Sequence, residues 1–311
     1  MRLSDIDLRS LEVFIAVVEA QGIANAQALL NRDASTISRQ LGQLEERIGL
    51  RLCERGRGGF ALTGAGEQIY RNTVDLTLAL RRFEDAAETL KGHLSGKLRL
   101  AMIDNLISDP NCPLRNVLQR YGARRANEVH LHMEVMAPFQ IEQALLNHAA
   151  DVGIGIFPAH LEELDYQPLY QETDWLVCAP SHPLAGADSL ADVQEVLQTS
   201  AKVARHFLGS QDTTPLGGDP KHVSAWVSNV EAAALLILAG SHVGFLPNHY
   251  ARVWIESGQM VAVRPDHFRR SSLIEAAARR SRDSQTPAVD AFRDDMAAVL
   301  EVFGMPASTD R

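Results

Sequence analysis

Small polar residues and an arginine gather at the start of a short amphipathic segment, DASTISRQLGQLEER (residues 33–47). Ile37, Leu41 and Leu44 recur every three or four residues, the spacing of one buried face of an α-helix. The opposite face is suited to DNA, because Arg pairs with guanine and Ser contacts either bases or phosphates. The residues that we assign to a nucleic-acid contact here are Ala34, Ser35, Thr36, Ser38, Arg39 and Gln43.

The preceding segments decide between a DNA-reading helix and an ordinary surface helix, which Asp33 would cap equally well. Residues 8–21 and 24–30 have the apolar spacing of two more helices, and two residues separate the second of them from Asp33. Such a tight pair is typical of a helix-turn-helix, in which the later helix enters the major groove. The context therefore favours the DNA-reading helix.

A glycine-rich turn follows in RLCERGRGGFALTGAG (residues 51–66). Two short extended pieces flank the glycines, which predicts a β-hairpin. Arg55 and Arg57 lie at its tip and would meet the neighbouring minor groove. We therefore interpret the hairpin as the wing of a winged helix-turn-helix.

The segment from about residue 64 to residue 93 has the clearest periodicity of the chain. Ile69, Leu76, Phe83 and Leu90 are seven residues apart, and Leu80 belongs to the interleaved set. This is a heptad seam, and a seam exposed on one chain requires a partner chain. We predict dimerisation through these five residues; the alternative is a seam that packs on its own domain.

Strands alternate with helices from residue 97 onward, which predicts an α/β sheet with right-handed crossovers. About 215 residues with this alternation of strands and helices are enough for two lobes, with a ligand cleft at the carboxyl ends of the strands. The strands are expected at 97–102, 130–135, 151–157 and 175–179, and the helices at 110–121, 139–148 and 289–303.

The composition is that of a globular protein, with 46% hydrophobic and 22% charged residues. A net charge of −9 argues against a generally basic surface, but residues 31–63 hold six arginines and four acidic residues, which suits a small DNA contact. No apolar run approaches the ~20 residues that span a bilayer. Three widely spaced cysteines build no disulfide framework. We expect a cytoplasmic protein without membrane contact.

Motifs of catalysis and of metal binding are missing from the sequence. It has no Gly-x-Ser-x-Gly elbow, phosphate loop or His-Glu-x-x-His, so we predict that the chain is not an enzyme and takes no cofactor. His130 and His132 share one strand face, but no third ligand lies at a recognisable spacing, so no metal site is predicted. Cys112 and Cys178 lie outside Lys- or Arg-rich runs and are interpreted as unreactive thiols.

The chain resembles the LysR-type transcriptional regulators. The resemblance is carried by LRSLEVFIAVVEAQGIANAQALL, TISRQLGQLEERIGLRL and ERGRGGFALTGAG, and more weakly by GKLRLAMIDN, DVGIGIF and AAALLILAGSHVGFLP. It implies a winged helix-turn-helix, a dimerising linker helix, and a two-lobed effector domain similar to periplasmic binding proteins. The implied bounds are 1–64, 65–94 and 95–311, with lobe I at about 95–166 and 268–311 and lobe II at about 167–267.

The resemblance also implies partners, namely double-stranded promoter DNA, a small-molecule effector, further copies of the chain in a homodimer and a homotetramer, and RNA polymerase. One alternative is a cytoplasmic solute-binding module whose N-terminal helices serve oligomerisation without reading DNA. At the start of the recognition helix, where the family usually has Ser-Gln-Pro, this chain has Asp33, Ala34 and Ser35. The Gln that would contact a base is missing, and Arg32, Arg39 and the wing arginines must offset the charge of Asp33.

In the effector domain the resemblance implies a cleft lined by the loop after the first strand and by four further segments. The residues concerned are Ile103, Asp104, Asn105, Ala137, Pro138, Val203, Arg205, Asn229, Phe245, Leu246 and Pro247. The first loop often presents Ser or Thr to a carboxylate ligand in the family, whereas Asp104 would repel an anion. We therefore expect either a ligand with a donor or cationic group, or an Asp104 that is neutralised by Arg205.

Overall fold

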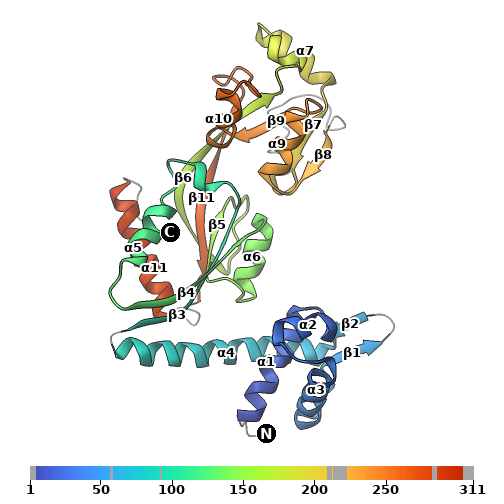
Figure 1. Ribbon diagram of the computed structural model, residues 1–311, viewed down its shortest axis with the longest axis vertical. Coiled ribbons are helices and arrows are strands. Elements are labelled where there is room, and N and C mark those ends of the chain that lie inside the picture. Colours follow the sequence, from blue (N-terminus) through green and yellow to red (C-terminus); the bar gives the residue numbers. More distant parts are fainter. Residues whose placement is uncertain are drawn as a thin grey trace. The chain divides into compact units, whose positions relative to one another are not determined.

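The computed structural model describes residues 5–56, 59–91, 93–208, 212, 223–281 and 286–303. The chain divides into two compact units, Met1–Ala87 and Glu88–Arg311. Each unit has its own hydrophobic core, and the long helix α4 (Gly64–Leu90) begins in the first unit and ends in the second (Figure 1).

The N-terminal unit is a winged helix-turn-helix, as predicted. Its helices are α1 (Asp5–Glu19), α2 (Ile23–Leu30) and α3 (Ala34–Ile48), and strands β1 (Cys53–Gly56) and β2 (Gly59–Leu62) form an antiparallel hairpin before α4. Asn31, with φ of 48°, ends α2 in the left-handed conformation that a tight turn requires. Gly49, with φ of 76°, ends α3 in the same way.

Helix α4 has two halves that differ in their surroundings. Near its start, Ile69 and Leu76 pack against the core of the winged domain, so these two predicted seam residues are at least partly used within the chain. Further along, Leu80, Phe83 and Leu90 are 39%, 73% and 90% exposed. The part of the seam available to a partner is therefore the second half of the helix.

The C-terminal unit is built on one mixed sheet. Among the described residues the sheet has seven strands in the order β10-β6-β11-β5-β3-β4, and β9 also pairs with β6. Strand β3 is parallel to β4 and β5, and the pairs that involve β6 or β11 are antiparallel. The strands are β3 (Leu94–Met102), β4 (Asn127–Val135), β5 (Val152–Gly155), β6 (Leu164–Cys178), β9 (Gly244–Pro247), β10 (Val261–Ala262) and β11 (Arg269–Arg279).

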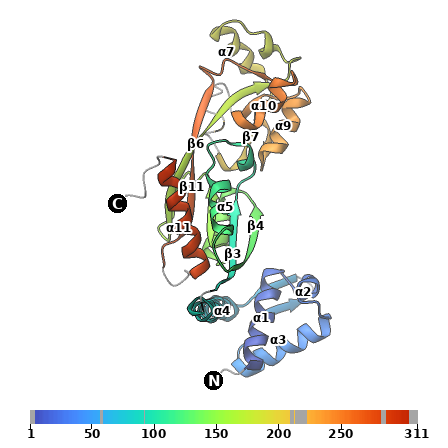
Figure 2. The same ribbon diagram turned by 60° about the vertical axis from the view of Figure 1, so that its left-hand side comes forward.

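Two lobes form around the long strands β6 and β11, which run through both (Figures 1 and 2). In lobe I, helices α5 and α11 cover one face of the sheet and α6 covers the other (Figure 1). Its helical elements are η1 (Leu106–Ser108), α5 (Leu114–Gly122), α6 (Pro138–Leu146) and α11 (Pro287–Val302). Lobe II contains a separate parallel strand pair, β7 (Lys202–Arg205) and β8 (Val223–Val227). Its helical elements are η2 (Pro183–Gly186), α7 (Leu190–Thr199), η3 (His206–Leu208), α9 (Val230–Leu238) and α10 (Asn248–Glu256).

The main departure from the sequence analysis is the length of β6. A short strand at 175–179 was expected, but the strand begins at Leu164 and carries the buried polar residues Glu172 and Asp174 in its middle. No helix within the described residues has both the length and the apolar character that crossing a bilayer requires.

Candidate functional site

The outward face of α3 has the arrangement that the sequence predicted. Ile37, Leu41 and Leu44 are fully buried beneath it. Of the residues assigned to DNA, Ser35, Arg39 and Gln43 are exposed and Ala34, Thr36 and Ser38 are half-buried. The helix therefore presents short side chains and one arginine near its amino end, where close approach to a groove is least hindered.

Asp33 organises the first turn of α3. Its carboxylate accepts hydrogen bonds from the Thr36 backbone N–H at 2.8 Å, the Ser35 hydroxyl at 2.5 Å and the Thr36 hydroxyl at 3.0 Å. These bonds, that of Ser35 first, lower the pKa of Asp33 to about 2. The cap fixes the orientation of two hydroxyls that we assign to DNA, and it keeps a negative charge beside them.

Neighbouring arginines are only partly described. Arg32 donates from Nη1 to Gln40 Oε1 at 3.0 Å, so its side chain folds back along α3. In the wing, the backbone of Arg55 pairs with Phe60, and Arg57 lies outside the described residues. The proposed contact of the wing with a minor groove thus stays a prediction.

In the C-terminal unit, Asp104 follows β3 and reaches across to lobe II. Its Oδ2 accepts a hydrogen bond of 2.7 Å from the backbone N–H of Val230, the first residue of α9. Asn229 caps the same helix by accepting from Ala232 N at 2.8 Å. Burial raises the pKa of Asp104, against the lowering effects of the Val230 N–H and of Arg205.

Neutralisation of Asp104 by Arg205 stays a prediction: Arg205 lowers the pKa of Asp104 electrostatically, but among the described residues its ion pairs are with other carboxylates. Arg205 is 2% exposed and donates from Nη2 to Asp174 Oδ2 at 2.7 Å. Arg270 donates to the same oxygen from Nε at 2.7 Å, and both arginines also pair with Asp212. Two arginines and two aspartates thus form a buried network, in which Asp174 and Arg270 come from segments distant in sequence and Asp212 lies seven residues from Arg205.

Most other residues predicted for the cleft contribute to packing. Ile103, Pro138, Val203, Phe245, Leu246 and Pro247 are buried. Val203 and Leu246 belong to one core cluster of lobe II, and the guanidinium of Arg270 lies 5.0 Å from the centre of the Phe245 ring. Ala137, before α6, donates its N–H to Gln140 Oε1 at 3.1 Å. An effector-binding role of these residues stays a prediction.

A surface cavity lies elsewhere in lobe I, and none of the predicted cleft residues lines it. Its walls come from the start of β6, the end of β11 and helix α11, and include His160, Tyr166 and Arg293. The predicted cleft, by contrast, is crossed by hydrogen bonds between the lobes, such as the bond from Val230 to Asp104.

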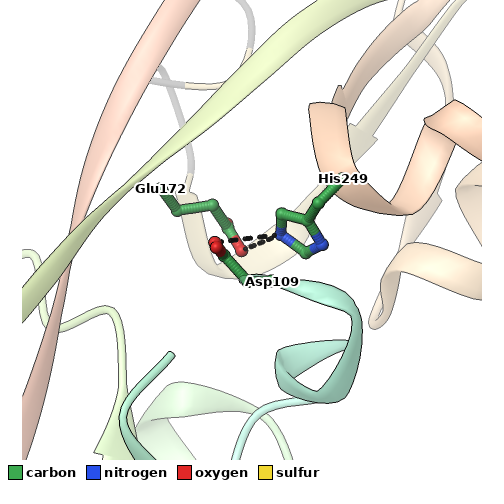
Figure 3. Close-up of side chains that lie close together, drawn as sticks. All are labelled: Asp109, Glu172 and His249. Carbon is green, nitrogen blue, oxygen red and sulfur yellow. Dashed lines mark hydrogen bonds and ion pairs between the residues drawn. The ribbon is translucent and has the colours of Figure 1, made fainter. Parts of the chain in front are cut away.

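One cluster of side chains that could bind a metal ion was not predicted from the sequence. Asp109, Glu172 and His249 lie close together, and their nearest donor atoms are all within 4.8 Å of one another (Figure 3). Glu172 and His249 are 77 residues apart in sequence, so no motif spacing could have indicated the cluster. Asn105, a predicted cleft residue, contacts it, with Nδ2 at 3.5 Å from Glu172 Oε1.

The histidine and cysteine residues that the sequence singled out are placed as follows. His132 lies on the exposed strand β4, where Nε2 is 2.7 Å from Glu134 Oε1. Burial raises the pKa of the half-buried Cys112 and raises that of the buried Cys178 to about 11. A raised pKa leaves few thiolates at neutral pH.

Comparisons with known proteins cover both units. The family model described as "Bacterial regulatory helix-turn-helix protein, lysR family" matches residues 8–67, and the model described as "LysR substrate binding domain" matches residues 91–301. The HTH-type transcriptional activator BauR of Pseudomonas aeruginosa is 34% identical over 286 residues, which are 90% of this chain and 92% of the relative.

Solved structures share the fold. ArgP from Mycobacterium tuberculosis matches with a TM-score of 0.62 and 17% identity, over 99% of this chain and 100% of the neighbour. Full-length CbnR in complex with its target DNA matches with a TM-score of 0.59 and 20% identity, over 94% and 99%. With its helix-turn-helix unit and its two-lobed effector domain, the chain belongs to the LysR family of transcriptional regulators.

Proposed function

We propose that this regulator reads promoter DNA with the outward face of α3. The observation that carries the proposal is the division of α3 into a fully buried face and an exposed polar face that includes Ser35, Arg39 and Gln43. Ser35, Ser38 and Arg39 would contact base edges or phosphates, and Arg57 the neighbouring backbone or minor groove. The chain would act in the cytoplasm and by binding alone, without catalysis.

Self-association would place two copies of α3 on one duplex. The exposed Leu80, Phe83 and Leu90 of α4 suit a dimer contact, and the complex of full-length CbnR with its target DNA is a precedent for DNA binding by a protein of this fold. Two recognition helices would enter major grooves roughly 34–36 Å apart, so the operator should be an interrupted palindrome. We extend this to a homotetramer that meets RNA polymerase at the promoter.

The effector would bind between the two lobes of the C-terminal unit, for which we keep the predicted domain bounds of 95–311. Among the described residues, Nε of Arg205 and Oδ1 of Asp174 are buried without a hydrogen-bond partner, and a bound ligand would supply one. Asp104 lies near the cleft, where its Oδ2 accepts from the Val230 N–H and Arg205 acts on it electrostatically. The carboxylates of Asp104 and Asp174 favour an effector with a donor or cationic group, and Nε–H of Arg205 would donate to an acceptor on the same effector. The affinity of the effector must differ between two lobe arrangements if its binding is to change DNA binding.

Operator binding by the Arg39→Ala variant tests the proposal. The operator is first obtained by sequencing DNA fragments that co-purify with the protein, and affinity is then measured by fluorescence anisotropy. Loss of a specific arginine contact should weaken binding by ~1 to 3 kcal/mol. Arg71→Ala is the matched control, because Arg71 is an exposed arginine on α4 outside the reading face. Equal affinity of the two variants would favour the alternative of an oligomerisation unit without DNA readout.

A further inference from the structure

Asp109, Glu172 and His249 meet where the two lobes face each other. Asp109 follows η1 of lobe I, Glu172 lies in the middle of the shared strand β6, and His249 belongs to α10 of lobe II (Figure 3). Their side chains are only 2%, 1% and 4% exposed. Two carboxylates and an imidazole are thus collected from three elements and withdrawn from water.

The distances suit a metal ion of the first transition row. Nε2 of His249 is 3.0 Å from Glu172 Oε1 and 3.3 Å from Asp109 Oδ2. An ion bound at about 2.0–2.2 Å from nitrogen and oxygen donors holds neighbouring donors about 3 to 3.5 Å apart. The two distances to His249 fall in this range, and the donor atoms of Asp109 and Glu172 lie within 4.8 Å of each other.

The hydrogen bond at Nδ1 of His249 turns Nε2 towards the two carboxylates, where Nε2 now lies 3.0 Å from Glu172 Oε1. The Ser108 hydroxyl donates its single proton to the Asn105 carbonyl at 3.0 Å and lies 2.9 Å from His249 Nδ1. Ser108 must therefore accept from Nδ1, which fixes the proton of a neutral ring on that nitrogen. The lone pair of Nε2 then points at two carboxylates. Metal-binding histidines are oriented in the same way by a hydrogen bond from their other nitrogen.

Charge balance also calls for a cation. Within the described part of the chain, the ion-pair partner of both Asp109 and Glu172 is His249, whereas Arg205 and Arg270 pair with Asp174 and Asp212. Arg205 attracts Glu172 electrostatically, but the two buried carboxylates still share one imidazole as their ion-pair partner, which is costly in a dry site. A divalent cation with a neutral histidine would balance both.

A buried tyrosine hydroxyl near the cluster is a second group that a bound ion and its water could satisfy. Tyr170, two residues before Glu172, lies on the same face of β6 and is 4% exposed. Among the described residues its hydroxyl has no nitrogen or oxygen partner, and its polar neighbour is the weakly bonding thiol of Cys112. Buried hydroxyls are usually bonded to protein, water or ligand. A water bound to an ion in the cluster would give this hydroxyl a partner.

We propose that Asp109, Glu172 and His249 bind one divalent transition-metal ion, Zn²⁺ in first place, and that the ion joins lobe I to lobe II. The imidazole donor favours Zn²⁺ over Mg²⁺ and Ca²⁺, which prefer oxygen ligands. The remaining coordination positions would hold water or a donor group of the effector. Because the ion holds both lobes, its binding favours the closed arrangement. The metal site itself does not depend on the DNA-reading role of α3.

Calorimetric titration of the full-length chain with ZnCl₂, after removal of bound metals by a chelator, tests the proposal directly. We expect one saturable site per chain, and weaker binding of MgCl₂ in the same buffer. Glu172→Gln and His249→Asn should each weaken Zn²⁺ binding by more than about tenfold, because each removes a ligand. Ser108→Ala should weaken it by about 10- to 100-fold through loss of the bond that orients His249.

His132→Ala is the matched control, since His132 forms an exposed pair with Glu134 and should bind no buried ion. Its Zn²⁺ affinity should equal that of the unaltered chain. Absence of a saturable site, or equal affinities for His249→Asn and His132→Ala, would overturn the proposal. No DNA is present in the titration, so the outcome is separate from that of the operator-binding test.

A spectroscopic measurement on the unaltered protein covers the case in which the buried variants fail to fold. Mn²⁺ bound to the chain should show, in pulsed electron paramagnetic resonance, the coupling of one directly bound histidine nitrogen. The coupling should persist in His132→Ala and disappear when excess Zn²⁺ is added. A Mn²⁺ spectrum without nitrogen coupling would refute coordination by His249.

Discussion

Replacing Arg205 by methionine should destabilise lobe II, because the structure uses this arginine as a buried structural cation. Arg205 is 2% exposed, pairs with Asp174 at 2.7 Å and also contacts Asp212. The Arg205→Met substitution keeps much of the side-chain volume and removes the charge. Asp174, itself 2% exposed, would lose one of its two arginines.

The expected cost follows from the geometry. Breaking a buried ion pair by removing one partner costs about 3 to 5 kcal/mol. Arg270 still donates to Asp174 Oδ2 from Nε at 2.7 Å and from Nη2 at 2.5 Å, so Asp174 is not left alone. We therefore expect the lower end of the range, about 3 kcal/mol in the free energy of unfolding of this lobe.

Tryptophan fluorescence during urea denaturation measures this cost locally. The three tryptophans of the chain are Trp175, Trp226 and Trp254, and all belong to the lobe II segment. Their emission therefore reports unfolding of the lobe that contains Arg205. The expected result is a transition midpoint shifted to lower urea with little change of slope.

Arg280→Met is the matched control for this prediction. Arg280 pairs with Asp165 at 2.8 Å, but the two side chains are 64% and 49% exposed, and exposed pairs contribute at most about 1 kcal/mol. A shift for Arg205→Met no larger than that for Arg280→Met would refute the reasoning. The buried ion pairs of Arg205 would then contribute no more to stability than an exposed pair.

Two further predictions concern the pH dependence of stability and the oligomeric state. Asp295 is buried, which by itself raises its pKa, but hydrogen bonds from Arg124 and Arg120 lower the pKa below its ordinary value. The stability that it contributes is therefore complete above about pH 4, the region of an unfolded aspartate, and is lost as the pH falls further. By calorimetry the melting temperature of Asp295→Asn should lie below that of the unaltered chain at pH 7, and the difference should shrink towards pH 3; a constant difference would contradict the assignment. Phe83→Glu on α4 should lower the mass of the assembly measured by light scattering, because Phe83 is 73% exposed in the single chain and is expected to contact a partner chain. Leu29→Glu is the control: Leu29 is 68% exposed but lies outside the heptad seam, so the mass should not change. Equal masses for the two variants would exclude the seam as the contact between chains.

The helical parts of the chain were predictable because local patterns determine them. Ile37, Leu41 and Leu44 identify the buried face of α3, Asp33 caps it, and Gly49 ends it, so both the fold and the reading face follow from short-range spacing. The heptads of α4 were also predictable from the sequence. Which heptad positions pack on the chain's own core and which stay exposed for a partner chain could not be predicted. Ile69 and Leu76 have the same spacing as Phe83 and Leu90, and surroundings alone distinguish them.

The interior of the effector domain could not be predicted, because its polar residues find partners far away in sequence. Glu172 and Asp174 interrupt the apolar pattern of β6, and the predicted strand at 175–179 begins only after them. They are tolerated in a central strand because His249 pairs with one and Arg205 with the other. The spacing of apolar residues along the sequence does not predict such contacts.

Directed DNA cleavage from the reading face tests the central claim most directly. An iron chelate that cleaves DNA is attached at Ser35→Cys, in a chain whose half-buried Cys112 is replaced by serine while the buried Cys53 and Cys178 remain. With operator DNA, we predict two clusters of cuts in major grooves roughly 34–36 Å apart, one for each copy of α3. The same reagent on Arg71→Cys should cut weakly and without this pattern. Uniform cutting by the Ser35 conjugate, or no cutting of a bound operator, would contradict the assignment of α3 as the element that reads DNA.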